Sequence, residues 1–418
     1  MEAYGTEIGE AVAVAEKPKV VLGVSGGIAA YKACELLRRF TESGHDVRVV
    51  PTASSLHFVG AATWSALSGN PVSTEVWDDV HQVPHVRIGQ GADLVVVAPA
   101  TADMLAKAAH GLADDLLTNT LLTARCPVVF APAMHTEMWE HPATQENVAT
   151  LRRRGAVVVE PAVGRLTGVD TGKGRLPDPG EIFEVCRRVL ARGAAAPDLA
   201  GRHLVISAGG TREPLDPVRY LGNRSSGKQG YALARTAAAR GARVTLVEAN
   251  TGFPDPAGVD VVHVGTALQL REAVLKAAAD ADAVVMAAAV ADFRPETYAT
   301  GKIKKKGDEG APTVPLVRNP DILAEISAER VRPGQVVVGF AAETDDVLAN
   351  GRDKLRRKGC DLLVVNEVGE RKTFGSEGNE AVVLASDGGE TSIPFGPKEA
   401  LADTVWDLVV PRLGPGAA

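Results

Sequence analysis

The sequence predicts an α/β protein of two domains, each built on a largely parallel β-sheet. Its 418 residues are many for a single domain. Strand and helix patterns alternate along both halves, as in doubly wound sheets. Val, Ala and Gly are abundant and aromatic residues make up only 4%, a composition typical of buried parallel strands beneath closely packed helices.

The first half contains five short apolar runs that predict strands. They lie at residues 20–24, 46–50, 93–98, 127–130 and 156–159, with helical patterns between them, for example at 28–42 and 103–110. Residues 1–18 hold four glutamates and no basic start before an apolar run, so we expect a disordered tail rather than a signal peptide. Small residues at 191–201 predict a linker between domains at 19–190 and 202–418.

The alternation restarts in the second half, where six further strands are expected. They lie at residues 203–207, 243–247, 283–288, 335–339, 361–365 and 381–385, with a helix at 229–240. Residues 299–318 are rich in Lys, Gly and Pro, which predicts a mobile loop rather than a core element.

Bulk properties exclude several classes of protein. The net charge of −7 argues against a nucleic-acid binder. No run approaches the roughly 20 apolar residues that span a bilayer, so we expect a cytoplasmic protein without membrane partners. The cysteines form no CxxC pair, which argues against a disulfide framework or a structural zinc site. They are Cys34, Cys126, Cys186 and Cys360.

Three strand ends in the first half carry residues suited to a phosphate. After the first strand, Ser25-Gly26-Gly27-Ile28 opens a helix whose N–H groups and partial positive charge favour an anion. It is not GxGxxG, so a mononucleotide fits better than a dinucleotide. A tight turn without ligand explains this loop equally well. Thr52 with Ser54 and Pro99-Ala100-Thr101 follow two more strands, where ligands of α/β sheets bind, although such hydroxyls also serve as helix N-caps.

Residues 19–190 resemble the flavin-dependent cysteine decarboxylases, through SGGIAAYK (25–32), PATAD (99–103) and APAMHTEMW (131–139). The resemblance implies a flavodoxin-like fold, trimers and FMN bound between subunits. It also implies that FMN contacts Ser25 to Ile28 and the other two strand ends. His81 and His85 both precede the third strand. By resemblance the base-like histidine is His85, which lies seven residues before Ala92.

Two positions depart from the pattern of that family. His135 stands after Met134, where the family has an Asn that contacts the substrate carboxylate. Gly168 stands where a mobile flap carries a proton-donating cysteine, so the donor is left open. The glycine-rich composition of this stretch still suits a lid. Its other expected residues are Asp170, Gly172 and Arg175.

The second half holds polar segments that suit a nucleotide. Residues 223–228 (NRSSGK) precede a helix and are not a Walker A loop, so they indicate a phosphate-binding loop or a solvated cap. Asp292 follows a buried strand and could bind a ribose hydroxyl or a metal. The basic run at 302–306 indicates either a solvated face or a lid over a triphosphate.

Nearly all of residues 202–410 resemble phosphopantothenate–cysteine ligase. The matching segments are SAGGTREPLDPVRYLGNRSSGKQG, AAAVADFRP, KIKK, NPDI and GFAAET. Joined to the first half, they resemble the bacterial bifunctional phosphopantothenoylcysteine decarboxylase and phosphopantothenate–cysteine ligase of coenzyme A biosynthesis. The resemblance implies a Rossmann-like ligase domain in which CTP activates 4'-phosphopantothenate as an acyl-cytidylate, and cysteine then attacks.

By resemblance, Lys302 stabilises charge on the reacting phosphate and Asn223 holds the acyl-cytidylate. Mg²⁺ is expected with the triphosphate. The positions that match CTP contacts are Asp292, Lys302, Pro320, Asp321, Ile322, Leu323, Phe340, Lys354 and Lys358. The family suggests a homo-oligomer, a dodecamer of decarboxylase trimers joined through ligase dimers.

Two other functions compete with this assignment. The missing flap cysteine and the histidine at position 135 also suit a regulatory protein that binds FMN but has lost decarboxylation. The ligase segments argue against a purely regulatory role. An NAD(P)-dependent oxidoreductase is disfavoured because GxGxxG is absent.

Overall fold

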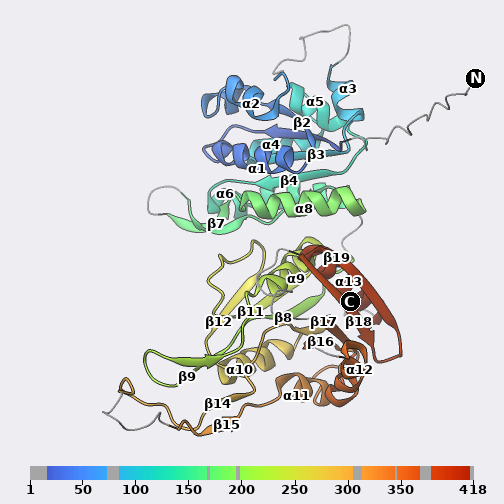
Figure 1. The fold of residues 1–418 in the computed structure, drawn as a ribbon. Helices are drawn as coiled ribbons and strands as arrows, with labels where there is room; N and C mark the ends of the chain where they lie inside the picture. The colour runs from blue at the N-terminus through green and yellow to red at the C-terminus, as the bar shows by residue number, and fades with distance from the viewer. Residues whose placement is uncertain are drawn as a thin grey trace, which may run out of the picture. The chain divides into compact units, whose positions relative to one another are not determined.

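The computed structural model describes residues 17–72, 84–166, 170–193, 198–304, 313–343, 346–367 and 378–414. The expected tail, apart from its last two residues, and the flap residue Gly168 therefore lie outside the described residues. The chain divides into two compact units, Met1–Ala194 and Ala195–Ala418 (Figure 1). No helix among the described residues is both long enough and apolar enough to cross a bilayer.

The first unit contains a five-stranded parallel sheet with the strand order β2-β1-β3-β4-β5. All five strands coincide with the apolar runs of the sequence, so that prediction is confirmed. Every residue of β3 is buried, as expected for a central parallel strand. The strands are β1 (Lys19–Val24), β2 (Asp46–Pro51), β3 (Leu94–Ala100), β4 (Val128–Pro132) and β5 (Val157–Val158).

Helices cover both faces of this sheet. Successive side chains of a strand point to opposite faces, so strands that are apolar throughout need a helical layer on each side. Leu94 and Val96 pack with α1 (Ala30–Glu42), α2 (Ala61–Ser68) and α8 (Pro179–Arg192). Val95 and Val97 pack on the other face. The elements there are α3 (Pro84–Gln90), α4 (Ala102–His110), α5 (Leu116–Thr123), α6 (Thr136–Glu140) and α7 (Pro142–Arg153).

Two smaller elements complete the first unit. The short helix η1 (Ala53–His57) follows β2. Strands β6 (Ala162–Arg165) and β7 (Thr171–Arg175) pair antiparallel and form the base of the expected flap.

The second unit contains an eight-stranded sheet with the order β12-β11-β8-β13-β16-β17-β18-β19. The first six strands are parallel and the last two antiparallel. The six predicted strands are confirmed. They are β8 (His203–Gly209), β11 (Arg243–Ala249), β13 (Ala283–Met286), β16 (Val336–Glu343), β17 (Leu362–Glu367) and β18 (Gly378–Ala385).

Strands β12 (Asp260–Val264) and β19 (Glu390–Pro397) were not predicted. Both lie at edges of the sheet. Their side chains are largely exposed, with Val262 at 40% and Phe395 at 69% of full exposure. Edge strands keep polar and exposed residues, so they lack the continuous apolar run that marks a buried strand.

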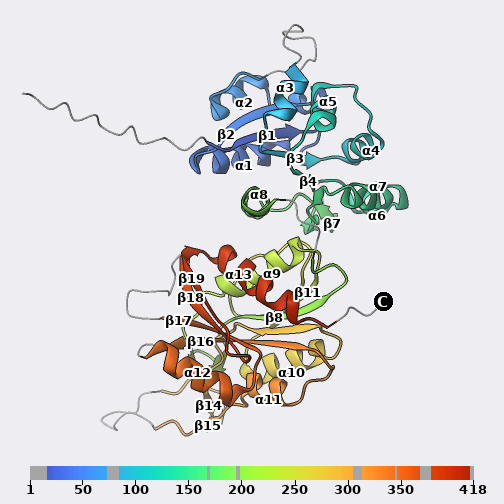
Figure 2. The same ribbon diagram turned by 90° about the vertical axis from the view of Figure 1, so that its right-hand side faces the viewer.

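Figure 2 shows α9 (Lys228–Ala239) and α13 (Lys398–Val409) on one face of the second sheet. The helices α10 (Ala267–Ala278), α11 (Ile322–Ala328) and α12 (Val347–Lys358) cover the other face. The short helix η3 (Val410–Arg412) continues α13. Cys360 is buried in the core beneath α10, α11 and α12, and burial raises the pKa of its thiol to about 11.

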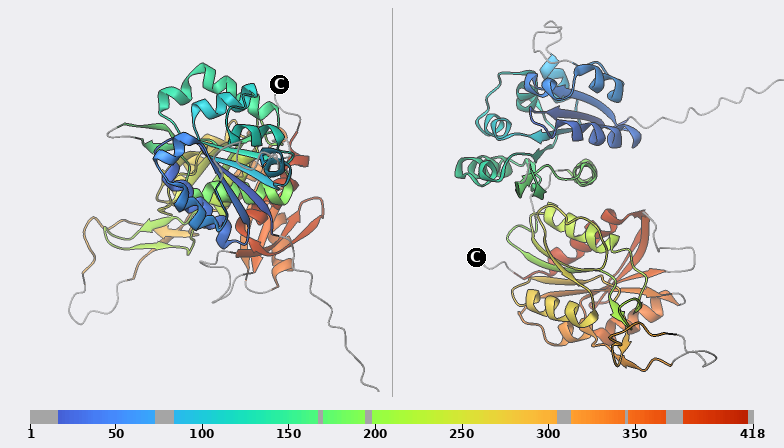
Figure 3. Two further views of the ribbon diagram at one scale, coloured as in Figure 1. Left: turned by 90° about the horizontal axis from the view of Figure 1, so that it is seen from above. Right: turned by 90° about the vertical axis from the view of Figure 1, so that its left-hand side faces the viewer.

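Two short antiparallel pairs extend away from the second sheet (Figure 3). They are β9 (Arg212–Pro214) with β10 (Tyr220–Gly222), and β14 (Phe293–Pro295) with β15 (Leu316–Arg318). β9 and β14 lie side by side. The expectation of a mobile loop over 299–318 is therefore wrong at its end, where β14 gives residues 316–318 a partner.

Candidate functional site

The carboxyl ends of β1 and β3 are joined through Ser25, which is buried. Its Oγ donates a hydrogen bond to the Pro99 carbonyl at 2.7 Å and accepts one from the Thr101 N–H at 2.9 Å. The Ser25 N–H also donates to the Pro99 carbonyl, at 3.2 Å. These bonds bring together two of the three strand ends to which the sequence assigned FMN.

The third strand end packs against the same loop through Gly26. A Cβ placed there would lie 3.0 Å from the Ser54 carbonyl carbon and nearer still to the Ser54 Cβ. Only glycine therefore allows this approach. Thr52 donates its N–H to the Val24 carbonyl at 2.9 Å, which fixes the end of β2 beside the end of β1.

The remaining members of this group have ordinary roles in the fold. The hydroxyl of Thr52 accepts a backbone N–H of η1, and the hydroxyl of Thr101 accepts one of α4. Both threonines are therefore helix N-caps, which is the role that the sequence offered as an alternative to ligand binding. Ala100 is buried, and its carbonyl accepts the Ala133 N–H at 3.1 Å. Ile28 is 69% exposed at the mouth of the loop.

His85 lies on α3 and not at a strand end. Helix α3 packs closely against α5, and the His85 carbonyl accepts the Thr123 hydroxyl at 2.8 Å. The ring Nδ1 is buried and has no hydrogen-bond partner among the described residues. A buried imidazole nitrogen without a partner is costly, which fits a group that meets a ligand or another subunit.

The flap strand β7 packs tightly on the segment that precedes α6. Met134 donates its N–H to the Gly174 carbonyl at 2.9 Å, and a Cβ at Gly174 would collide with the Met134 carbonyl. Likewise, a Cβ at Gly172 would collide with the Thr136 hydroxyl, which is buried and has no hydrogen-bond partner within the described part of the chain. The flap glycines therefore hold the two expected substrate contacts, Met134 and His135, against β7.

His135 is the exposed N-cap residue of α6, and its carbonyl accepts the Trp139 N–H at 3.0 Å. At the tip of the hairpin, the Asp170 carbonyl accepts the Leu166 N–H at 2.8 Å. Arg175 ends β7 near Lys32 of α1. Burial and the nearby Arg175 charge both lower the pKa of Lys32.

An ion-pair cluster at the base of the flap was not predicted from the sequence. Glu160 accepts Arg152 of α7 at 2.6 Å and Lys173 of β7 at 2.7 Å. The Lys173 Nζ also lies 6.0 Å from the centre of the Trp139 ring. Burial alone would raise the pKa of Glu160, but the two cations outweigh it and lower that pKa. The cluster ties β7 to the body of the first unit.

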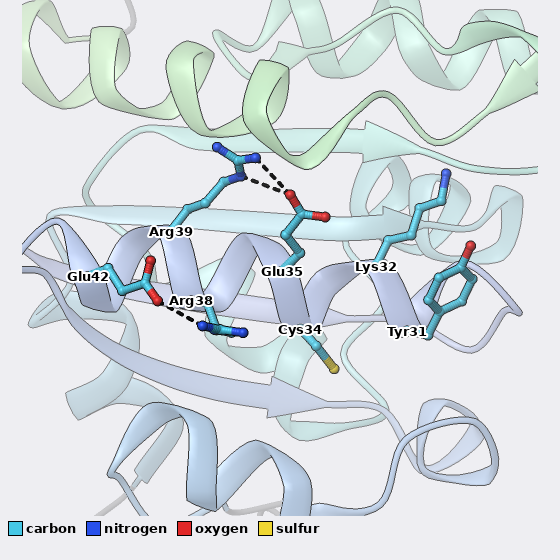
Figure 4. Close-up of a pocket in the computed structure, with 7 residues that line it drawn as sticks. All are labelled: Tyr31, Lys32, Cys34, Glu35, Arg38, Arg39 and Glu42. Atoms are coloured by element: carbon cyan, nitrogen blue, oxygen red, sulfur yellow. Dashed lines mark hydrogen bonds and ion pairs between the residues drawn. The ribbon is translucent and has the colours of Figure 1, made fainter.

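A groove of about 640 Å³ runs along α1. Figure 4 shows the side chains that line it. Two ion pairs lie along it, Glu35 with Arg39 and Glu42 with Arg38. None of the residues assigned to FMN lines it, so this groove is separate from the group of strand ends. Its lining residues are Tyr31, Lys32, Cys34, Glu35, Arg38, Arg39 and Glu42.

In the second unit, the ends of β8 and β13 meet through Thr211 and Asn223. The buried Thr211 hydroxyl accepts the Ala291 N–H at 3.0 Å. The side-chain amide of Asn223 donates to the Val290 carbonyl at 2.9 Å. Asn223, which follows β10, is therefore tied to the segment after β13 that carries the exposed Asp292.

The Pro320–Leu323 turn is joined to the same region and to β16 and α12. The Asn319 N–H donates to the Asp292 carbonyl at 2.8 Å. Asp321 pairs with Lys358, and Lys354 pairs with Glu343 at 3.0 Å. Leu323 packs over Gly339, next to Phe340, so that a Cβ at this glycine would collide with it. Asp292, the Pro320–Leu323 turn, Lys354 and Lys358 are thus linked around the ends of β13 and β16. The side chain of Phe340 packs on the other face of the sheet, with the core beneath α9 and α13.

Lys302 lies apart, in the chain that follows β14. Within the part of the chain that the structure describes, no hydrogen bond or ion pair joins its side chain to the Pro320–Leu323 turn. Its neighbour Ile303 is held instead by Asp216 and Arg219, between β9 and β10.

Sequence reasoning also missed Asn250, which ends β11 with a positive φ of 56°. Its side-chain amide donates to the carbonyls of Gly210 and Gly265, at 3.0 and 2.9 Å. Asn tolerates this left-handed conformation better than most residues, so an Asn after a buried strand was the available signal. Asn250 fixes the ends of β8, β11 and β12 relative to one another.

Comparison with known proteins agrees with this division of the chain. Residues 10–191 match the family described as Flavoprotein. Residues 199–412 match the family described as DNA/pantothenate metabolism flavoprotein C-terminal domain.

Similar proteins match along nearly the whole chain. "Coenzyme A biosynthesis bifunctional protein CoaBC" of Mycobacterium bovis is 63% identical over 94% of this chain and 96% of its own length. The protein of the same name from Vibrio cholerae is 43% identical over 94% of this chain and 97% of its own length. A solved structure of the C-terminal domain of a CoaBC protein is 33% identical, covers 52% of this chain and 98% of its own, and has a TM-score of 0.44. The extent of the two CoaBC sequence matches shows that the chain belongs to the family of bifunctional coenzyme A biosynthesis proteins named CoaBC.

Proposed function

We propose that the second unit joins 4'-phosphopantothenate to cysteine with CTP, through an acyl-cytidylate. The first unit then decarboxylates 4'-phospho-N-pantothenoylcysteine to 4'-phosphopantetheine with FMN. The observation that carries the proposal is that each unit has a group of its assigned ligand residues at the carboxyl edge of its own parallel sheet, where α/β proteins bind ligands, although His85 and Lys302 lie outside these groups. The two activities are therefore separable by substitution within one chain.

The residues of the first unit fit FMN. Gly26 allows the loop after β1 to lie directly against Ser54, and the helix N-terminus after the loop favours the flavin phosphate. Bound FMN would supply the redox chemistry, taking a hydride equivalent from the cysteinyl thiol and returning it after CO₂ is lost. His85 would act as the acid–base group, since its Nδ1 is buried without a partner among the described residues. His135 would donate a hydrogen bond to the substrate carboxylate.

The residues of the second unit suit a triphosphate. Lys354 and Lys358 supply positive charge from α12, and their present partners are Glu343 and Asp321. A triphosphate would compete for these cations. Asn223 is oriented by its hydrogen bond to the Val290 carbonyl and would hold the acyl-cytidylate. Lys302 would stabilise charge on the reacting phosphate.

Mg²⁺ would arrive with CTP. Among the residues that the structure describes, no group of three His, Cys, Asp or Glu side chains is placed to hold a metal ion. We propose that the magnesium ion is held mainly by the phosphate oxygens of CTP and by water. We further propose a cytoplasmic dodecamer, in which a neighbouring subunit completes the FMN site beside His85.

Two substitutions test the proposal. His85→Asn should abolish CO₂ release from 4'-phospho-N-pantothenoylcysteine and leave ligation intact, with the exposed His110→Asn as its control. Lys302→Gln should lower the rate of CTP-dependent ligation by about 10²–10³-fold and leave CO₂ release intact. Lys276→Gln, an exposed lysine on α10, is the control. Near-normal CO₂ release in His85→Asn would reject the role proposed for His85. Near-normal ligation in Lys302→Gln would reject the role proposed for Lys302.

The same assay discriminates the regulatory alternative. A wild-type protein that binds FMN but releases no CO₂ would be an FMN-binding protein that has lost decarboxylation. Release of CO₂ in proportion to bound FMN would reject that alternative, even though a glycine occupies the position of the flap cysteine.

A further inference from the structure

The turn between β9 and β10 is organised around Asp216, whose side chain is fully buried. One carboxylate oxygen, Oδ1, accepts the N–H groups of Val218 and Arg219 at 2.9 and 2.8 Å. The other, Oδ2, accepts the Arg219 guanidinium through Nε at 3.0 Å and Nη2 at 2.5 Å. The turn is therefore complete without any contact from the rest of the chain.

The same ion pair also binds a distant peptide segment. Asp216 Oδ2 accepts the Ile303 N–H at 3.1 Å, across 87 residues of sequence. Arg219 Nη2 donates to the Ile303 carbonyl at 2.8 Å. Both backbone groups of one residue are thus held by one carboxylate and one guanidinium. A further bond, from the Ala299 N–H to the Leu215 carbonyl at 3.1 Å, brings the approach to this segment to the same turn.

Ile303 lies between Lys302 and Lys304, which are both exposed. A lysine side chain has four rotatable bonds, so an exposed lysine samples many positions when its backbone also moves. Fixing the peptide groups on both sides of Ile303 removes the backbone part of this freedom. The backbone position of Lys302 therefore depends on the pair of Asp216 and Arg219.

We propose that Asp216, acting with Arg219, is the positioning residue that holds Lys302 in place for the CTP-dependent step. The inference rests on the ligase function proposed above. Asp216 acts through the Ile303 backbone and has no contact with the reacting groups. The Arg219 guanidinium, with the N–H groups around the carboxylate, holds the pKa of Asp216 well below its usual range. Asp216 therefore remains an acceptor throughout the working pH range.

Asp216→Asn tests the inference because all five donors at this site are N–H groups, and the amide adds a further donor where an acceptor is required. We expect faster cleavage by trypsin after Lys302 and Lys304, mapped by mass spectrometry. We also expect kcat for ligation to fall by about 100-fold, as for a catalytic group displaced by about 1 Å. The KM for CTP should change much less, because the other CTP residues lie elsewhere. Val218→Ala, which removes a 61% exposed side chain from the same turn, is the matched control.

The outcomes separate this inference from the proposed function. If trypsin cleaves Asp216→Asn after Lys302 and Lys304 no faster than it cleaves the wild-type protein, the inference is overturned, whatever Lys302→Gln does to ligation. Full ligation in Lys302→Gln would instead refute the role proposed for Lys302. If Asp216→Asn is cleaved throughout residues 198–414, the decision passes to Arg219→Met. That variant leaves the backbone N–H bonds of Val218 and residue 219 to Asp216 and removes the donor to the Ile303 carbonyl, so faster cutting at the lysines supports the inference and cutting at the wild-type rate overturns it.

Discussion

Replacing Gly26 by alanine tests whether the loop after β1 binds the FMN phosphate. The added Cβ would lie 3.0 Å from the Ser54 carbonyl carbon, and nearer still to the Ser54 Cβ. Carbon atoms pack at about 3.5–4.0 Å, so relieving the contact with the Ser54 Cβ requires one of the two loops to retreat by more than about 1 Å. Both loops carry residues assigned to FMN, and their separation would change the shape of the site.

Overpacking of this kind costs about 1–3 kcal/mol. If the ligand-bound conformation bears that cost, the Kd for FMN rises by about 5- to 150-fold. CTP-dependent ligation should remain unchanged, because its residues belong to the second unit.

The assay is a titration of flavin-free protein with FMN, followed by flavin fluorescence. Gly60→Ala is the matched control, since a Cβ at Gly60 meets nothing within 4 Å. A Kd for Gly26→Ala equal to that of the wild-type protein, in a folded first unit, would refute the assignment of this loop to FMN.

Three further predictions concern stability and the flap. Arg240→Ala should lower the free energy of unfolding of the second unit by about 3 kcal/mol in urea denaturation, because Arg240 is 3% exposed and pairs with three aspartates; a loss below about 1 kcal/mol would contradict this. The Glu248 carboxylate raises the pKa of His263 above 6.5 in the folded protein. The wild-type protein should therefore be more stable than His263→Gln below pH 6.5, and this difference should shrink as the pH rises through the pKa of His263 in the folded state. A difference in stability that does not change with pH would exclude this linkage. Glu160→Gln should speed hydrogen exchange in β7 and slow CO₂ release, since it weakens the pair with Lys173; unchanged exchange would show that the glycine contacts suffice.

The order of the strands along the chain could be predicted because buried parallel strands are continuous apolar runs. The edge strands β12 and β19 could not, because their largely exposed residues form no continuous apolar run. The pairs β9–β10 and β14–β15 could not, because strands of three residues carry no periodic signal. β14 and β15 are also separated by the residues between Pro295 and Leu316, so neither strand indicates its partner locally.

The candidate sites were predicted in part for a physical reason. Parallel strands place their carboxyl ends at one edge, so residues that follow strands gather there. Which ends become neighbours depends on the strand order, and Gly26 meets Ser54 only because β1 lies beside β2. The bond between Asp216 and Ile303 joins residues 87 positions apart, and nothing near either residue indicates the other.

The central claim is that each unit binds its own nucleotide at the carboxyl edge of its own sheet. Hydrogen exchange of the full chain, measured with FMN alone and then with CTP and Mg²⁺ alone, tests it most directly. We expect FMN to protect residues 23–28, 52–56 and 99–104, and CTP to protect residues 290–292, 319–325 and 340–343. Protection of the same unit by both ligands, or protection that misses these segments, would contradict the claim.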